Sequence, residues 1–143
     1  AGDGPLLKEY EEHVERRGLK IMFIGFQPDI RRLLAVSDIM LLPSFLELHS
    51  IAILEAMSMK VPVVVSQDVG CNSEFIKDGE NGILCDPFNE NSWAEPIIRL
   101  LEDKTYRQAM GEAGYETCRE KFDIAKTVLQ VESVYEELHT PHK

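Results

Sequence analysis

Apolar residues follow two kinds of pattern along this chain, and the two kinds alternate. Four runs are short and almost continuously apolar, as in strands that are buried on both faces of a parallel sheet: 21–26, 39–42, 61–65 and 83–85. Elsewhere apolar residues recur every three or four positions, as in amphipathic helices: 6–17, 30–36, 93–102, 105–121 and 124–138. Two further helices are expected, one at 50–59 that is apolar almost all round and a short one at 74–77 in a turn-rich stretch. This alternation predicts an α/β fold, a Rossmann-like parallel sheet with helices on both faces.

The length of 143 residues fits one domain, with α/β layers over about residues 1–121 and a C-terminal helix and tail over 122–143. The formal net charge of -10 argues against nucleic acid or an anionic membrane as a partner, since both select clustered Lys and Arg. Three widely spaced cysteines predict neither a disulfide framework nor a zinc site. We therefore expect a cytoplasmic protein without a structural metal.

The helix expected at residues 50–59 carries the unusual feature of the sequence. Glu55 lies among apolar residues on every side, so the helix should be buried, and a buried carboxylate is costly unless it is paired or hydrogen-bonded. Two interpretations remain open with similar weight. Glu55 meets a backbone amide, a basic side chain or solvent, or it accepts hydrogen bonds from the hydroxyl groups of a ligand.

The position of this helix favours a ligand. In open parallel sheets, ligands bind beyond the carboxyl ends of the strands, and residues 43–50 connect such an end to the helix. If Ser50 is the N-cap, the first amides of the helix are unpaired and suit a phosphate. Glu55 follows Ile51 by one turn on the same face, about 6 Å along the axis. With Glu47 ahead of the helix, the arrangement suits a nucleotide-sugar.

Glu47 and Glu55 are separated by seven residues and followed by Ala-Met. This spacing resembles the E-x7-E signature of the retaining GT-B glycosyltransferases of group 1. Further segments resemble landmarks of that family in the same order along nearly the whole chain: 2–5 (G-D-G-P), 23–25 (F-I-G), 37–38 with 42–44 (S-D, L-P-S), 62–64 (P-V-V), 69–74 (V-G-C-N-S-E) and 78–82 (D-G-E-N-G). The chain then corresponds to the C-terminal half of a GT-B fold, in incomplete form.

The resemblance implies a donor site for a UDP- or GDP-linked sugar and glycosyl transfer with retained anomeric configuration, without a metal or other cofactor. Glu47 would be the catalytic residue that holds the transferred sugar, and Glu55 would bind the ribose. Near the diphosphate, the implied donor-binding residues are His49, Ser50, Ile51 and Ala52. Near the nucleobase, they are Gly25 and Phe26. An enzyme of this kind chiefly stabilises the departing diphosphate and positions the acceptor.

Departures from the family pattern leave alternatives open. Ser50, Lys60 and Cys71 stand where the family has glycine, and His49 stands where an aromatic residue is common. A non-catalytic nucleotide-sugar-binding or interaction module, or a nucleotide-sugar epimerase, therefore remains possible. The acceptor-binding domain and the first strands of the donor domain have no counterpart in this sequence. We expect them in a longer parent, so that this chain alone binds donor weakly and is inactive.

Two more expectations follow from the resemblance. In the family's sheet, the strands without a counterpart lie between the strands expected at 21–26 and 39–42. Their absence would expose apolar strand edges, which favours aggregation. We therefore expect one of three outcomes: a longer parent supplies the strands, the two flanking strands pair directly, or two copies of the chain pair or exchange elements across the gap. The rest of a parent protein would also decide whether it is peripheral at a membrane.

Overall fold

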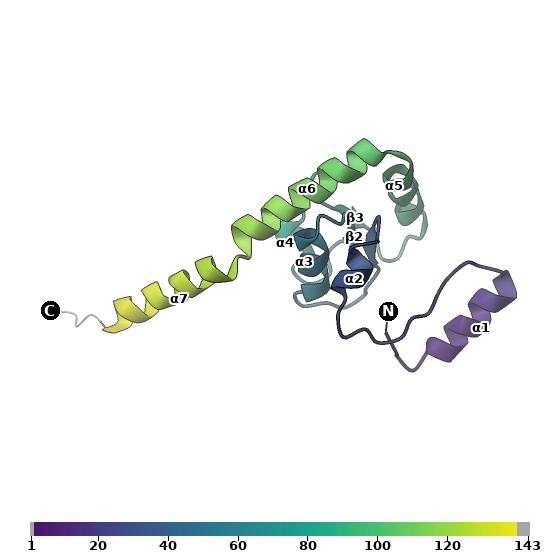
Figure 1. The fold of residues 1–143 in the computed structure, drawn as a ribbon, viewed down its shortest axis with the longest axis horizontal. Coiled ribbons are helices and arrows are strands. Elements are labelled where there is room, and N and C mark those ends of the chain that lie inside the picture. The colour runs from purple at the N-terminus through teal and green to yellow at the C-terminus, as the bar shows by residue number, and fades with distance from the viewer. Residues whose placement is uncertain (1, 140–143) are drawn as a thin grey trace. The chain divides into compact units, whose positions relative to one another are not determined.

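The computed structural model describes residues 2–139 of the chain, which divides into two compact units, residues 1–32 and 33–143. The first unit holds helix α1 (Leu7–Arg17), which Figure 1 shows in purple. The helix ends at Gly18, whose φ of 61° is left-handed. Glycine adopts this conformation without a steric penalty and is therefore well suited to end a helix.

The strand expected at residues 21–26 is not formed, and this part of the prediction is wrong. Within the described residues, the segment pairs with no other strand. Its apolar side chains are largely exposed, with Met22 at 82% and Phe26 at 70%. An apolar run becomes a strand only where a neighbouring strand accepts its backbone hydrogen bonds, and this segment has no such neighbour.

The second unit is built on a parallel sheet, as predicted. Its described strands are β1 (Met40–Leu42), β2 (Val63–Ser66) and β3 (Ile83–Cys85), in the order β1-β2-β3. In the register, Met40 is opposite Val63, and Val64 is opposite Ile83. All residues of the central strand β2 are buried, so both of its faces are covered. The α/β, Rossmann-like fold class is therefore confirmed.

The helices after α1 follow the predicted segments closely. They are α2 (Arg31–Leu34), α3 (Ile51–Ser58), α4 (Asn72–Phe75), α5 (Asn91–Glu102), α6 (Lys104–Lys121) and α7 (Ile124–His139). Among the described helices, none is both long and apolar enough to cross a membrane. The outermost, α7, has no buried residue, and Figure 1 shows it in yellow-green after α6.

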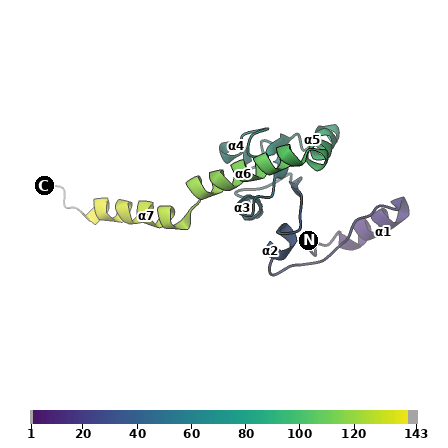
Figure 2. The ribbon, with the colours of Figure 1, turned by 45° about the horizontal axis from the view of Figure 1, so that its top comes forward.

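One cluster of the core lies between the sheet and helices α5 and α6. Leu100 of α5 and Met110 of α6 pack on Val64, Ile83 and Cys85 of the sheet. Helices α3 and α6 also lie side by side, as Figures 1 and 2 show. A glycine of α6 permits this approach, since a Cβ at Gly111 would overlap the carbonyl oxygen of Lys60. Helix α6 thus holds α3 in place under the candidate site.

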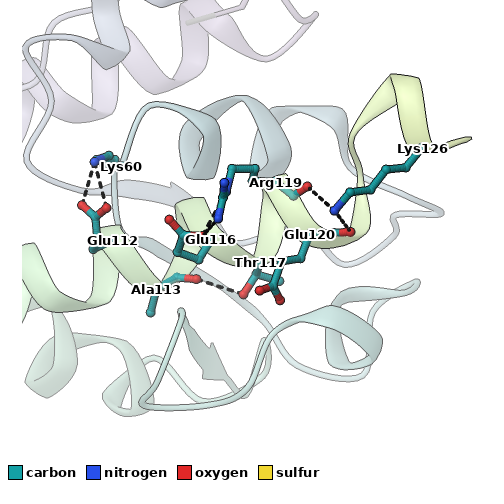
Figure 3. Close-up of polar contacts among 8 residues, drawn as sticks. All are labelled: Lys60, Glu112, Ala113, Glu116, Thr117, Arg119, Glu120 and Lys126. Atoms are coloured by element: carbon teal, nitrogen blue, oxygen red, sulfur yellow. Dashed lines mark hydrogen bonds and ion pairs between the residues drawn. The ribbon is translucent and has the colours of Figure 1, made fainter.

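Polar contacts on α6 fix its two neighbours (Figure 3). Lys60, which follows α3 with a left-handed φ of 59°, forms an ion pair with Glu112 at 2.8 Å. At the other end, the ammonium of Lys126 in α7 donates to the carbonyl oxygens of Arg119 and Glu120, at 3.5 and 3.3 Å. A lysine at the last carbonyls of a helix is favourable because these groups carry partial negative charge.

Candidate functional site

The loop of residues 43–50 leaves the carboxyl end of β1 and enters α3, as the sequence predicted. Glu47 is half-buried in this loop, and its Oε1 accepts a hydrogen bond of 2.8 Å from the hydroxyl of Ser44. The contact orients the carboxylate without neutralising it, because a neutral hydroxyl is the donor. Glu47 therefore remains an acceptor for further donors.

A second loop, which carries Gly70 and Cys71, packs against the first and holds it in position. No prediction from the sequence assigned this second loop to the site. An ideal Cβ at Gly70 would lie 2.6 Å from the carbonyl oxygens of both Glu47 and Leu48. The amide of Cys71 donates to the Leu48 carbonyl at 3.0 Å. Burial, and then the charge of Glu74, raise the pKa of the Cys71 thiol, which opposes a nucleophilic role. The only sequence signal for this second loop was a glycine in a turn-rich stretch.

The start of α3 presents free backbone amides. Ser50 is 7% exposed and occupies the N-cap position with extended backbone angles, but its side chain makes no capping hydrogen bond. Within the described residues, the amides of Ser50, Ile51 and Ala52 have no acceptor outside the helix. Unpaired amides at a helix N-terminus carry partial positive charge and suit an anion.

Glu55 lies on the open side of α3 and not within a fully buried helix. The buried residues Ile53, Ala56 and Met57 face the sheet and α6, and at 100° per residue Glu55 falls roughly opposite them. Ile51, one turn earlier on the same side, is 68% exposed, which corrects the expectation of a helix buried all round. Within the described part of the chain, the half-buried Glu55 carboxylate has no ion pair and no hydrogen bond.

His49 is held by rings from two other parts of the unit. Its imidazole lies 5.5 Å from the ring of Phe75 in α4 and 5.5 Å from that of Phe122, which follows α6. The two phenyl rings meet edge to face at 5.3 Å. This cluster packs His49 against the protein, which supports a role in positioning the loop.

Gly25 and Phe26 belong to the first unit, whereas the other six predicted site residues belong to the second. Gly25 has a left-handed φ of 64°, and its carbonyl accepts from the amide of Gly2 at 2.7 Å. Phe26 is 70% exposed. The participation of these two residues in a site with Glu47 stays a prediction.

Other candidate sites are poorly supported. Across residues 2–139, no group of three or more His, Cys, Asp and Glu side chains is placed to hold a metal ion. A shallow hollow of about 960 Å³ lies along α5 and the start of α6, between Asn91 and Thr105. None of the predicted donor-site residues lines that hollow.

The model of one protein family, described as glycosyl transferases group 1, matches residues 1–117. The chain belongs to this family. The N-acetyl-alpha-D-glucosaminyl L-malate synthase of Bacillus anthracis is 37% identical over 141 residues, which are 94% of this chain and 35% of that protein. An alpha-D-kanosaminyltransferase of Streptomyces kanamyceticus is 32% identical over 142 residues, which are 96% of this chain and 36% of that protein. This group 1 chain thus spans about a third of the length of these relatives.

Solved structures agree with the family assignment. HepE of Anabaena, in complex with UDP, superposes with a TM-score of 0.85 at 27% identity, covering 92% of this chain and 36% of that one. The HepE complex with UDP-glucose superposes with a TM-score of 0.81 at 26% identity and covers the same shares of the two chains. The fold of this group 1 chain is therefore that of part of a GT-B glycosyltransferase.

Proposed function

We propose that this chain is the donor-binding part of a retaining glycosyltransferase that uses a nucleoside diphosphate sugar. Its family membership supports glycosyl transfer as the reaction class. The HepE structures, which are similar to this chain and contain UDP or UDP-glucose, support a nucleotide-sugar as the donor. A UDP-linked sugar is therefore the first donor to test.

The unpaired carboxylate of Glu55 carries the proposal. A half-buried carboxylate on an otherwise apolar helix is retained at a cost unless it has donors to accept from. Glu55 has no such donor within the described residues, and it lies about 6 Å along the helix axis from the free amides at Ile51. A ribose provides two adjacent hydroxyl donors, and its diphosphate reaches the amides.

Glu47 has a separate role in the proposal. Its carboxylate, oriented by Ser44, accepts hydrogen bonds from hydroxyl groups of the transferred sugar. The amides of Ser50, Ile51 and Ala52 stabilise the negative charge that grows on the diphosphate as the glycosidic bond breaks. Because these amides are fixed by the helix, little reorganisation is needed at the moment of reaction.

The same proposal assigns the acceptor to another domain. The chain spans about a third of its relatives, which leaves room in proteins of that size for an acceptor-binding domain facing this site. The edge strand β1 and the unpaired segment at residues 21–26 would pair with further strands of the donor domain itself in such a protein. Without such strands, we propose that two copies of the chain associate through these edges.

Titration of the isotope-labelled chain by NMR tests the proposed donor site. UDP, UDP-glucose and GDP are added separately, and the amide resonances of residues 47–55 are expected to shift with at least one of them. The variant Glu55→Gln should weaken that binding about tenfold, since a charge-assisted hydrogen bond is worth about 1.5–3 kcal/mol. The matched control is Glu95→Gln on α5, outside the site. Resonances that stay unmoved with all three nucleotides would contradict the proposal.

A further inference from the structure

Gly70 lies against the backbone of the loop that carries Glu47. The space for a Cβ at this position is already filled by the carbonyl oxygens of Glu47 and Leu48, each 2.6 Å away, and by the Glu47 carbonyl carbon at 2.9 Å. Its φ of 58° also lies in the left-handed region. We propose that Gly70 is a positioning residue that sets the place of the Glu47 carboxylate at the donor sugar. The inference rests on the proposed function.

The contact between Gly70 and the Glu47–Leu48 segment leaves no room for adjustment, because both sides of it are main chain. A clash with the end of a flexible side chain is relieved by a new rotamer, but the Glu47–Leu48 peptide has no such freedom. The adjacent hydrogen bond from the Cys71 amide to the Leu48 carbonyl, at 3.0 Å, ties the two loops together at the same point. Any displacement of Gly70 is therefore passed to Glu47.

The segment that carries Gly70 is itself anchored to the sheet. The side-chain amide of Asn72, which is 1% exposed, donates to the carbonyl of Ser66 at 2.9 Å. Ser66 is the last residue of the central strand β2. Two hydrogen bonds, from the Cys71 amide to the Leu48 carbonyl and from the Asn72 side chain to the Ser66 carbonyl, thus connect the Glu47 loop to β2, the most buried strand of the unit.

An alanine at Gly70 would force the loops apart by about 1 Å, since non-bonded carbon and oxygen atoms settle near 3.5 Å. Misplacement of about 1 Å can cost on the order of 100-fold where a group must meet a substrate precisely. The loss of affinity should concern the sugar more than the nucleotide. In the proposed site Glu47 contacts the sugar, whereas Glu55 and the helix amides contact the nucleotide.

The experiment compares the affinities of the chain for UDP and for UDP-glucose in four forms: wild type, Gly70→Ala, Glu47→Gln and the double variant. Gly79→Ala is the control, because Gly79 has a left-handed φ of 76° but nothing within 4 Å of its Cβ position. It carries the same backbone strain without the collision. Circular dichroism establishes that each variant is folded.

We expect Gly70→Ala and Glu47→Gln each to weaken UDP-glucose binding about tenfold relative to UDP, and the double variant to add little more. Gly79→Ala should leave the ratio of the two affinities unchanged. A folded Gly70→Ala chain with the wild-type ratio overturns the positioning role alone. Wild-type chain that binds neither compound overturns the proposed function and this inference with it.

If Gly70→Ala does not fold, Asn72→Ser replaces it. This variant removes the anchor to Ser66 and adds no atom beside the Glu47 loop. The same loss of preference for UDP-glucose over UDP is expected, and an unchanged ratio overturns the inference.

Discussion

The imidazole of His49 and the phenyl ring of Phe122 lie 5.5 Å apart, centroid to centroid, at an interplanar angle of 43°. Phe122 follows the last residue of α6 and precedes α7 by two positions. The contact therefore joins the loop of the candidate site to the junction of the last two helices. Phe75 of α4 completes the cluster, so α4 and the end of α6 both meet the loop of residues 43–50 at the His49 ring.

Truncation of Phe122 should destabilise this unit and release His49. Phe122→Ala is expected to lower the free energy of unfolding by about 2 kcal/mol, roughly half the cost for a fully buried phenylalanine, because Phe122 is half-buried. The loss of two ring neighbours should also shift the His49 imidazole resonances. Chemical denaturation and NMR measure the two effects.

Phe88→Ala is the matched control, since Phe88 is 86% exposed and stacks only on Phe45 among the described aromatic rings. Its free energy of unfolding should change by less than about 0.5 kcal/mol. Unaltered His49 resonances in Phe122→Ala would mean that the ring does not hold the loop.

Removal of the Ser44 hydroxyl tests the orientation of Glu47. Ser44→Ala should weaken UDP-glucose binding by about three- to tenfold and leave UDP binding within twofold, since only the sugar is expected to contact Glu47. Isothermal titration measures both affinities. Ser37→Ala, which removes an exposed hydroxyl bonded to the Leu33 carbonyl, should change neither. Equal losses for both ligands would place Ser44 at the nucleotide instead.

Much of the fold was predictable because the local signals agree with the tertiary contacts. The apolar runs at 39–42, 61–65 and 83–85 became strands since each has a partner in the same sheet. Helix α6 begins within one residue of its predicted start, because the carboxylate of Asp103 accepts from the Tyr106 amide at 2.9 Å. Such caps are encoded within a few residues and can be read from the sequence.

The features that could not be predicted depend on residues far apart in the chain. The run at 21–26 has the composition of a strand, but a strand also needs a neighbour, and composition does not report one. The loop after β1 and the helix α3, on which we place the candidate site, formed where the sequence predicted them. The packing of Gly70 against the Glu47 backbone was not predicted, because a contact between residues so far apart in the chain leaves no periodic pattern in the sequence.

Asn81 should be among the most sensitive polar positions of the chain. It is 5% exposed, its side-chain amide donates to the Phe75 carbonyl and the Thr117 hydroxyl, and its oxygen accepts from the Lys77 amide at 2.7 Å. Asn81→Ala should cost about 3 kcal/mol, because one buried and two part-buried groups lose this hydrogen-bond partner. Thermal denaturation measures the loss.

The exposed Asn91 at the start of α5 provides the control for Asn81. Asn91→Ala should change the free energy of unfolding by less than about 0.5 kcal/mol. A loss in Asn81→Ala no larger than in this control would show that water replaces the three hydrogen bonds.

Cys85 should make the stability of the chain fall at alkaline pH. Burial, and then the charge of Asp78, raise the pKa of its thiol from 9.0 to about 11. Between these values the folded chain keeps a proton that the unfolded chain has lost, so stability is full below pH 9 and declines as pH rises toward 11, by up to about 3 kcal/mol. Denaturation at pH 8 and 10.5 should show a smaller decline for Cys85→Ala than for Cys71→Ala, whose thiol is only half-buried. Equal declines in the two variants would remove Cys85 as the cause.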